Sequence, residues 1–241
     1  MSFEVPYLSD ADIETEANML LKSFEAKYGT IQTAATPLDE IIENHLGLGF
    51  EITDLGHPAI LGQLDIKQNL IRINTLLDPH QDRRKEGRYN YTLAHEGGHQ
   101  VLHRPYAEAL MDAPSLFEGE QEENEIILCR REDQKAPIEI QADKFASCLL
   151  LPREKVVNEF LEFANRPAVK MQPLLQALRH NRDFMNQAFP NWRYIPSDDE
   201  VLHYAFKELA DKFHVSMQAM VIRLKVIGLL QDSSQEEMSY A

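Results

Sequence analysis

The sequence has little cysteine and no long apolar run. Its two cysteines, Cys129 and Cys148, are too few for a disulfide framework and lack Cys-x-x-Cys spacing, which fits a reducing compartment. The first 16 residues lack the basic and apolar regions of a signal peptide. No run of about 18 apolar residues suggests a membrane span. We therefore expect a cytoplasmic protein.

Basic residues are scarce relative to acidic ones. The chain has 24 Lys and Arg against 39 Asp and Glu, a formal net charge of −15. Nearly all of this excess lies in three segments: residues 1–16 carry five acids and no base, residues 104–139 ten acids and four bases, and residues 232–241 three acids and no base. A chain this acidic repels phosphate backbones, which argues against direct DNA binding.

The rest of the composition is typical of a globular protein, with 241 residues of which 44% are hydrophobic. The spacing of apolar residues predicts long helices over 11–28, 82–103, 138–151, 153–164, 200–213 and 216–227, and short strands over 50–53, 59–66 and 70–74. We expect an α+β fold, mostly helical, with a small three-stranded sheet beside helix 82–103. We place one domain over 1–164 and a C-terminal helical region over 165–241.

The segment His95-Glu96-Gly97-Gly98-His99 is an HExxH motif, expected by chance roughly 0.03 times in a sequence of this composition. In an α-helix, residues four apart share a face, so His95 and His99 can bind one ion. Glu96 lies beside them, where it can take a proton from water held by the metal. The two glycines each cost a helix about 1 kcal/mol relative to Ala and indicate close packing.

A catalytic zinc site needs a third protein ligand. His103 continues the spacing, but in a regular helix it lies about 12 Å along the axis from His95, so we interpret it as a helix-end residue that complements the helix dipole. Glu139 begins a predicted helix, and Asp143, one turn later, can accept a hydrogen bond from the far nitrogen of a ligand histidine. The spacing alone leaves open whether Glu139 is a ligand or a carboxylate favoured by the helix dipole.

Four stretches, 71–74, 91–103, 139–152 and 215–224, make the chain resemble the ImmA/IrrE family of metallopeptidases, also described as domain of unknown function 955. The resemblance implies a zincin-like fold in which His95, His99 and Glu139 ligate one Zn²⁺ ion and Glu96 is the catalytic acid/base. It also implies a zinc-dependent endopeptidase that cuts a helix-turn-helix repressor. The chain departs from the family pattern in a longer acidic insert between His99 and Glu139 and in residues 165–198.

Three further expectations concern the substrate. Zincins bind a peptide as an added strand at a sheet edge, and we expect hairpin 59–74 to supply that edge. The donor that stabilises the oxyanion lies outside the motif, with Tyr89, His203 and Arg223 as candidates. The acidic segment 104–139 joins the two predicted ligand helices, so it is either a lid that favours a basic substrate or a solvated loop without a role.

Two other functions remain open. Residues 209–224 have the pattern of a DNA-binding helix-turn-helix, but residues 207–225 carry only four bases against two acids, which favours helix packing or partner docking. Alternatively, the chain binds a metal and sequesters a repressor without cutting it. Glu96 favours an enzyme over this regulator, because a purely structural metal site needs no general base.

Overall fold

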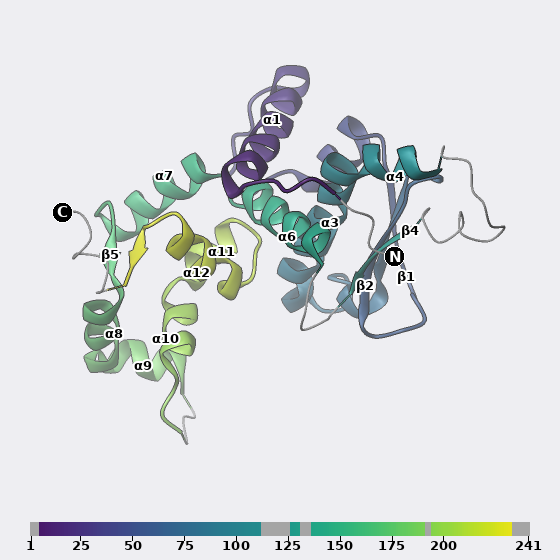
Figure 1. The fold of residues 1–241 in the computed structure, drawn as a ribbon. Coiled ribbons are helices and arrows are strands. Elements are labelled where there is room, and N and C mark those ends of the chain that lie inside the picture. Colours follow the sequence, from purple (N-terminus) through teal and green to yellow (C-terminus); the bar gives the residue numbers. More distant parts are fainter. Residues whose placement is uncertain (1–4, 112–125, 131–135, 191–193, 233–241) are drawn as a thin grey trace. The chain divides into compact units, whose positions relative to one another are not determined.

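The computed structural model describes residues 5–111, 126–130, 136–190 and 194–232 (Figure 1). The chain forms two compact units, Met1–Pro152 and Arg153–Ala241. The boundary therefore falls after Pro152, earlier than the expected boundary at residue 164. The reason is helix α7 (Arg153–Ala164), which packs against α11 (Lys207–Lys212) and so belongs to the second unit.

The first unit combines helices with one small sheet. Its α-helices are α1 (Asp10–Tyr28), α2 (Leu38–Glu40), α3 (Glu86–Gly98), α4 (Arg104–Met111) and α6 (Pro137–Leu150). Two π-helical turns, η1 (Ile41–His45) and η4 (His99–His103), and two 3-10 turns, η2 (Thr75–Leu77) and η3 (Arg83–Lys85), adjoin them. No helix within the described ranges of the chain is both long enough and apolar enough to cross a membrane.

The sheet contains the three expected strands and a fourth. Its order is β1 (Gly49–Thr53), β3 (Leu70–Asn74), β2 (Ile60–Asp65) and β4 (Ile126–Arg130). β1 runs parallel to β3, whereas β2 is antiparallel to both β3 and β4. Both edges of the β2–β3 hairpin are therefore covered, and the expectation that hairpin 59–74 offers the substrate-binding edge is wrong. Strand β4, which covers the edge of β2, belongs to the acidic segment 104–139. It lies more than 60 residues from β2 in sequence, so local patterns could not predict this pairing.

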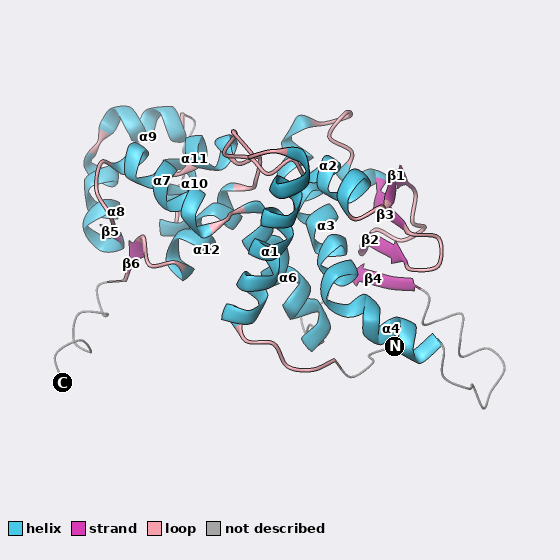
Figure 2. Cartoon of the chain, turned by 90° about the horizontal axis from the view of Figure 1, so that it is seen from above, coloured by secondary structure: helices cyan, strands magenta, loops and turns pink. Residues whose placement is uncertain are grey.

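Helix α3 lies at the centre of the first unit. Figure 2 shows α3 against one face of the sheet, with α6 and then α1 packed outside it. Every residue of α3 from Thr92 to Gly98 is buried. The side chains that fill these layers are apolar: Leu64, Ile71 and Ile73 from the sheet, Leu93 and Ala94 from α3, Phe145 and Leu149 from α6, and Ile13, Ala17 and Phe24 from α1.

Two glycines permit the close packing of α3. A Cβ atom added to Gly98 would lie 3.3 Å from Cα of Ala142 in α6 and 3.2 Å from Cδ1 of Phe145. On the opposite side of α3, a Cβ atom added to Gly62 of β2 would lie 2.5 Å from Oε1 of Glu96 and 2.7 Å from Cγ2 of Thr92. The contacts of α3 with α6 and with β2 therefore both depend on a glycine, which has no Cβ atom to keep the two elements apart.

The motif helix does not end at His103 as expected. After α3, the chain makes the π-helical turn η4 and continues into α4. The amide of Arg104 donates to the carbonyl of His99, five residues back. Pro105 follows this turn directly, so the π-helical turn lies where the missing N–H of Pro105 interrupts the hydrogen bonds of the helix. His103 is thus an interior helical residue, and it is fully buried.

The second unit is helical with one short strand pair. Besides α7 and α11 it contains β5 (Val169–Lys170), α8 (Met171–His180), α9 (Arg182–Ala188), α10 (Asp198–Ala205), α12 (Met217–Val226) and β6 (Leu230–Gln231). Strands β5 and β6 pair in parallel. The single helix expected over 200–213 is divided at Phe206 into α10 and α11.

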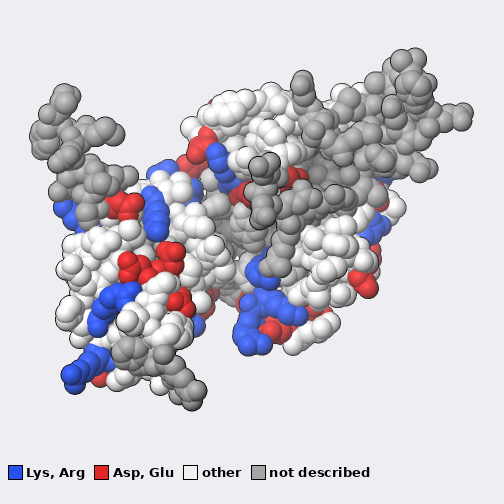
Figure 3. All heavy atoms as spheres, turned by 60° about the horizontal axis from the view of Figure 1, so that its bottom comes forward, with Lys and Arg blue, Asp and Glu red and all other residues white. Residues whose placement is uncertain are grey.

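Helices α11 and α12 pack against each other, and Lys225 is an exposed basic residue of α12. Met217, Ile222 and Val226 of α12 are also exposed, whereas Arg223 is buried. On the face of the molecule in Figure 3, the described Lys and Arg side chains are interspersed with Asp and Glu. Neither observation indicates a phosphate-binding surface.

The close approach of Gly62 to Glu96 predicts that a larger residue at position 62 destabilises the fold. Gly62→Ala should lower the free energy of unfolding by about 1–3 kcal/mol, because the added methyl group overlaps Thr92 and Glu96. Urea denaturation measures this change. Gly49→Ala is the matched control on β1, where the new methyl group meets only a side-chain atom of Leu70 at 3.3 Å and a backbone oxygen at 3.9 Å. Equal stability of the two variants would contradict the close contact at Gly62.

Candidate metal centre

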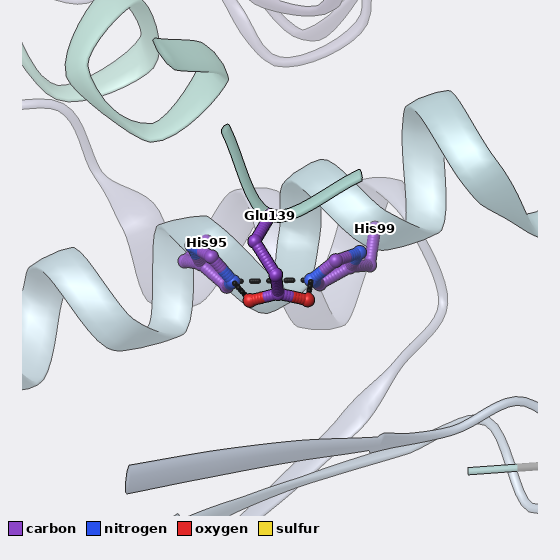
Figure 4. A group of neighbouring side chains, drawn as sticks. All are labelled: His95, His99 and Glu139. Atoms are coloured by element: carbon purple, nitrogen blue, oxygen red, sulfur yellow. Dashed lines mark hydrogen bonds and ion pairs between the residues drawn. The ribbon is translucent and has the colours of Figure 1, made fainter. Parts of the chain in front are cut away.

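His95, His99 and Glu139 converge at one point in the first unit (Figure 4). Nε2 of His95 and Nε2 of His99 are 3.0 Å apart. The two carboxylate oxygens of Glu139 lie 3.2 Å from Nε2 of His95 and 3.3 Å from Nε2 of His99. Both histidines are fully buried, and Glu139 is partly exposed. The three residues are therefore able to hold a metal ion.

Local sequence explains how the three side chains meet. His95 lies in the last turn of α3 and His99 begins η4, so one continuous helical segment presents both rings on one face. Glu139 lies in the first turn of α6, which begins at Pro137. A proline is favoured at this position, and a carboxylate in the first turn is stabilised by the helix dipole.

The donor atoms have the spacing of ligands that share one ion. Two ligands that each lie about 2.0–2.1 Å from a tetrahedral ion are roughly 3.3 Å apart. The two ring nitrogens are 3.0 Å apart, and each lies 3.2 or 3.3 Å from a different oxygen of Glu139, so all of these separations are close to this value. Two imidazole nitrogens and one carboxylate oxygen are also a common ligand set for zinc and other divalent transition metals. The residues therefore fit the metal that the motif implies.

Glu96 is fully buried beside the cluster, and neither of its carboxylate oxygens has a hydrogen-bond partner. Its side chain lies between α3 and Gly62 of β2. Burial raises the pKa of Glu96 to about 8, with the neighbouring charge of Glu139 raising it further and His95 opposing the shift. A buried carboxyl group without a partner is costly, which points to a role that a water molecule at the metal would explain.

The carboxylate of Asp143 contacts the ring of His95. Its Oδ1 atom lies 3.0 Å from Nδ1 of His95, the ring nitrogen that faces away from the cluster. A carboxylate can only accept here, so Nδ1 of His95 carries the proton and Nε2 is left as a lone pair toward the cluster. The hydroxyl of Tyr91 donates to the backbone carbonyl of Asp143 over 3.2 Å and ties α3 to α6 beside this contact.

His103 contacts the second ligand histidine, so its interpretation as a helix-end residue is wrong. Its Nδ1 atom lies 2.9 Å from Nδ1 of His99, and its Nε2 atom lies 3.0 Å from Oε1 of Gln141. Burial lowers the pKa of His103 to about 4, and the neighbouring His99 lowers it further. His103 is therefore neutral at physiological pH. Sequence reasoning missed Gln141 entirely, although its position between Glu139 and Asp143 was a signal.

The electrostatics of the cluster favour a bound cation. Burial alone would raise the pKa of Glu139, but the rings of His95 and His99 beside its two oxygens outweigh burial and hold the pKa well below its usual range. Burial lowers the pKa of His99. Glu139 is thus an anion and His99 a neutral ring at physiological pH, which are the protonation states that metal binding requires.

The three oxyanion candidates are divided between the two units. Tyr89 lies in α3 and is buried, and burial raises the pKa of its hydroxyl. His203 and Arg223 belong to the second unit, not to the unit that carries the cluster. Most of the acidic segment, including Glu118, lies outside the described residues, so the expectation of a lid stays a prediction.

Comparisons with known proteins do not identify a family for the chain. No protein-family model matches the chain. A search of curated proteins finds no protein with significant similarity to it. The resemblance to metallopeptidases therefore stays a prediction, and the geometry of the site must carry the functional argument.

The contact between Asp143 and His95 predicts a loss of metal affinity on mutation. Asp143→Ala should weaken Zn²⁺ binding by about 10- to 100-fold, because partners that orient a ligand histidine have effects of this size. Competition with a chromophoric chelator measures the affinity. Asp10→Ala is the control. Asp10 lies in α1 and pairs with Lys144, the residue that follows Asp143 in α6, but Asp10 does not touch the cluster. Equal affinities of the two variants would exclude an orienting role for Asp143.

Proposed function

We propose that the chain is a zinc-dependent endopeptidase of the ImmA/IrrE type. In this proposal His95, His99 and Glu139 ligate one Zn²⁺ ion, and Glu96 is the catalytic acid/base. The observation that carries the proposal is the carboxylate of Glu96, which is buried without a partner beside the three converging ligands. A structural zinc site would have four protein ligands and no need for such a group.

The ligand set supports zinc and an open coordination position. Catalytic zinc sites use three protein ligands, often two histidines and a glutamate, and leave the fourth position for water or substrate. Imidazole and carboxylate also bind Mn, Fe, Co and Ni, so metal analysis of protein purified without chelator tests the choice of ion. When bound, zinc supplies Lewis-acid activation of water and of the substrate carbonyl.

The residues around the cluster divide the remaining tasks. Glu96 takes the proton of the attacking water and delivers it to the amine that leaves as the peptide bond breaks. Burial between α3 and β2 excludes bulk water from Glu96, and its raised pKa of about 8 lies close to physiological pH, as suits a group that both accepts and donates a proton. Asp143 holds His95 in the tautomer that can ligate the ion.

In this proposal the substrate peptide pairs with the edge of β4, and not with the hairpin formed by β2 and β3. β4 is the last strand of the described sheet on the side of β2, and β2 contacts Glu96 through Gly62. An extended peptide that pairs with β4 is thus one strand removed from the strand that covers the catalytic carboxylate. The acidic segment that contains β4 suits a basic partner, such as a DNA-binding repressor of the helix-turn-helix type.

Substitution of Glu96 tests the enzymatic role. With the helix-turn-helix repressor encoded beside this chain as substrate, Glu96→Gln should lower the cleavage rate by about 10²- to 10⁴-fold, because the amide cannot take up a proton. Gel electrophoresis and mass spectrometry of the products measure cleavage. The zinc content should stay at that of the wild type, since Glu96 is not one of the three converging ligands.

The same assay separates the alternatives. Equal cleavage by wild type and Glu96→Gln would remove the assigned role of Glu96. Stable binding of the repressor by both proteins without cleavage would replace the peptidase with a metal-binding regulator that sequesters its partner. Salt-dependent DNA binding by the chain itself would favour a DNA-binding protein, against the exposed apolar positions of α12.

A further inference from the structure

Strand β2 meets the carboxylate of Glu96 with a glycine, and the contact leaves no room for a side chain. A Cβ atom added to Gly62 would lie 2.5 Å from Oε1 of Glu96 and 2.7 Å from Cγ2 of Thr92. A slip of β2 by one residue would put Leu61 or Gln63 in this place, each with a side chain that needs the same space. The cover over Glu96 therefore requires that β2 stays in one register.

A β-bulge lies directly beside Gly62, so the ladder alone fixes this register weakly. Ile60 and Gly62 pair with successive residues of β4, which makes Leu61 an extra residue in β2. On the other side of β2, the pairing with β3 begins at Gly62, opposite Ile73. A bulge disrupts the ladder where it occurs. The start of β2 thus needs a support besides its pairing with the neighbouring strands.

The side chain of Asn74 supplies this support. Asn74 is the last residue of β3 and is buried. Its Nδ2 atom donates to the carbonyl of Ile60 over 2.8 Å and to the carbonyl of His57 over 3.3 Å. The amide of Ile60 also donates to the carbonyl of His57, so both acceptors belong to the turn that leads into β2. One amide group therefore connects the end of β3 to the start of β2.

Backbone groups fix the orientation of this amide. The carbonyls of Ile60 and His57 have no protons, so they must meet the N–H groups of Asn74. The oxygen of Asn74 accepts from the amide of Leu76 over 3.0 Å and caps η2. A turned amide would place its oxygen against two carbonyls and its N–H groups against the N–H of Leu76. No ionisable side chain takes part in these three hydrogen bonds.

We propose that Asn74 is a positioning residue that holds the bulged start of β2 in the register that places Gly62 against Glu96. Asn74 acts on the reaction only through these two residues, because its own hydrogen bonds go to backbone groups at the start of β2 and of η2. Its effect on activity rests on the proposed catalytic role of Glu96. The register itself is a structural property that can be tested without activity.

A crystal structure of Asn74→Ser tests the register. Serine is as good an N-cap as asparagine, so the variant keeps the cap of η2 but loses the long amide that reaches Ile60. We expect residues 60–62 to be displaced and the contact between Gly62 and Glu96 to open. An unchanged contact would overturn the proposal. Asn74→Thr, which stays closer to the volume of asparagine, serves in the same way if the serine variant does not fold.

Kinetics test whether Asn74 acts through Glu96. With the repressor of the preceding assay as substrate, Asn74→Ser should lower kcat by about 10- to 100-fold, the loss that a misplacement of about 1 Å causes. Zinc content should not change, because the three ligands lie outside β2. In a Glu96→Gln background the same substitution should change kcat by less than about 2-fold, since residues that act as a unit are not additive.

A matched control separates the role of Asn74 from that of a helix cap. Asn181 caps α9 in the second unit by accepting from the amide of Phe184 over 3.1 Å. Asn181→Ser should leave kcat at the wild-type value. A loss of full size from Asn74→Ser in both the wild-type and the Glu96→Gln backgrounds would overturn the positioning role, because a general loss of folded enzyme lowers both rates equally.

The outcomes distinguish this inference from the proposed function. A wild type that cuts no repressor would contradict the peptidase, and the crystal structure of Asn74→Ser would still decide whether Asn74 holds the register of β2. Cleavage at equal kcat by wild type and Asn74→Ser would overturn the positioning role and leave the peptidase intact.

Discussion

The close approach of α3 and α6 is the constraint on which the site depends. Gly98 lies between the two motif histidines in sequence and faces Ala142, which lies between Glu139 and Asp143. The point where the two helices are nearest is therefore also the point from which the ligands project. A larger residue at either position would separate the helices, and separating them would move the carboxylate of Glu139 away from both rings. Packing and metal-binding geometry are thus set by the same contact.

On the opposite face of α3 a second glycine also allows close packing, in this case over the carboxylate of Glu96. Gly62 lets β2 approach closely enough to cover Glu96, and that cover removes water from both of its oxygens. Leaving a buried polar group without a partner destabilises a fold by about 1–3 kcal/mol. The raised pKa of Glu96 reduces this cost, because the group is buried in its neutral form when no cation is present. A bound divalent cation would reverse that balance by favouring the carboxylate.

The sequence could reveal the parts of the site that follow regular helical spacing. His95, His99, Glu139 and Asp143 are each four residues from a partner on the same helix, and the structure brings all four together. His103 escaped because it was considered only as a third ligand beside His95, and not as a partner of His99. Residues four apart share a face in an α-helix as well, so the same spacing rule applied to His99 indicates the contact with His103 that the structure contains.

Partners that are distant in sequence could not be predicted. Gln141 meets the carbonyl of Pro6 across 135 positions, and β4 meets β2 across more than 60. No periodicity within a single segment encodes either contact. The helical class and strands β1 to β3 follow from local patterns, and so does a short strand at 126–128, whereas the pairing of β4 with β2 and the boundary at Pro152 depend on which surfaces pack together.

The fourth strand also anchors the segment that joins the motif helix to α6. The segment 104–139 leaves the motif helix through α4, pairs with β2 as β4, and returns to the cluster at Glu139. Its described parts, α4, β4 and the start of α6, therefore all contact elements that pack around α3. Because salt screens charges beyond about 8 Å at physiological ionic strength, an acidic segment influences substrate choice only if it is anchored near the site. The pairing of β4 with β2 supplies one such anchor, which is why the role of the segment is a question about this end of the sheet.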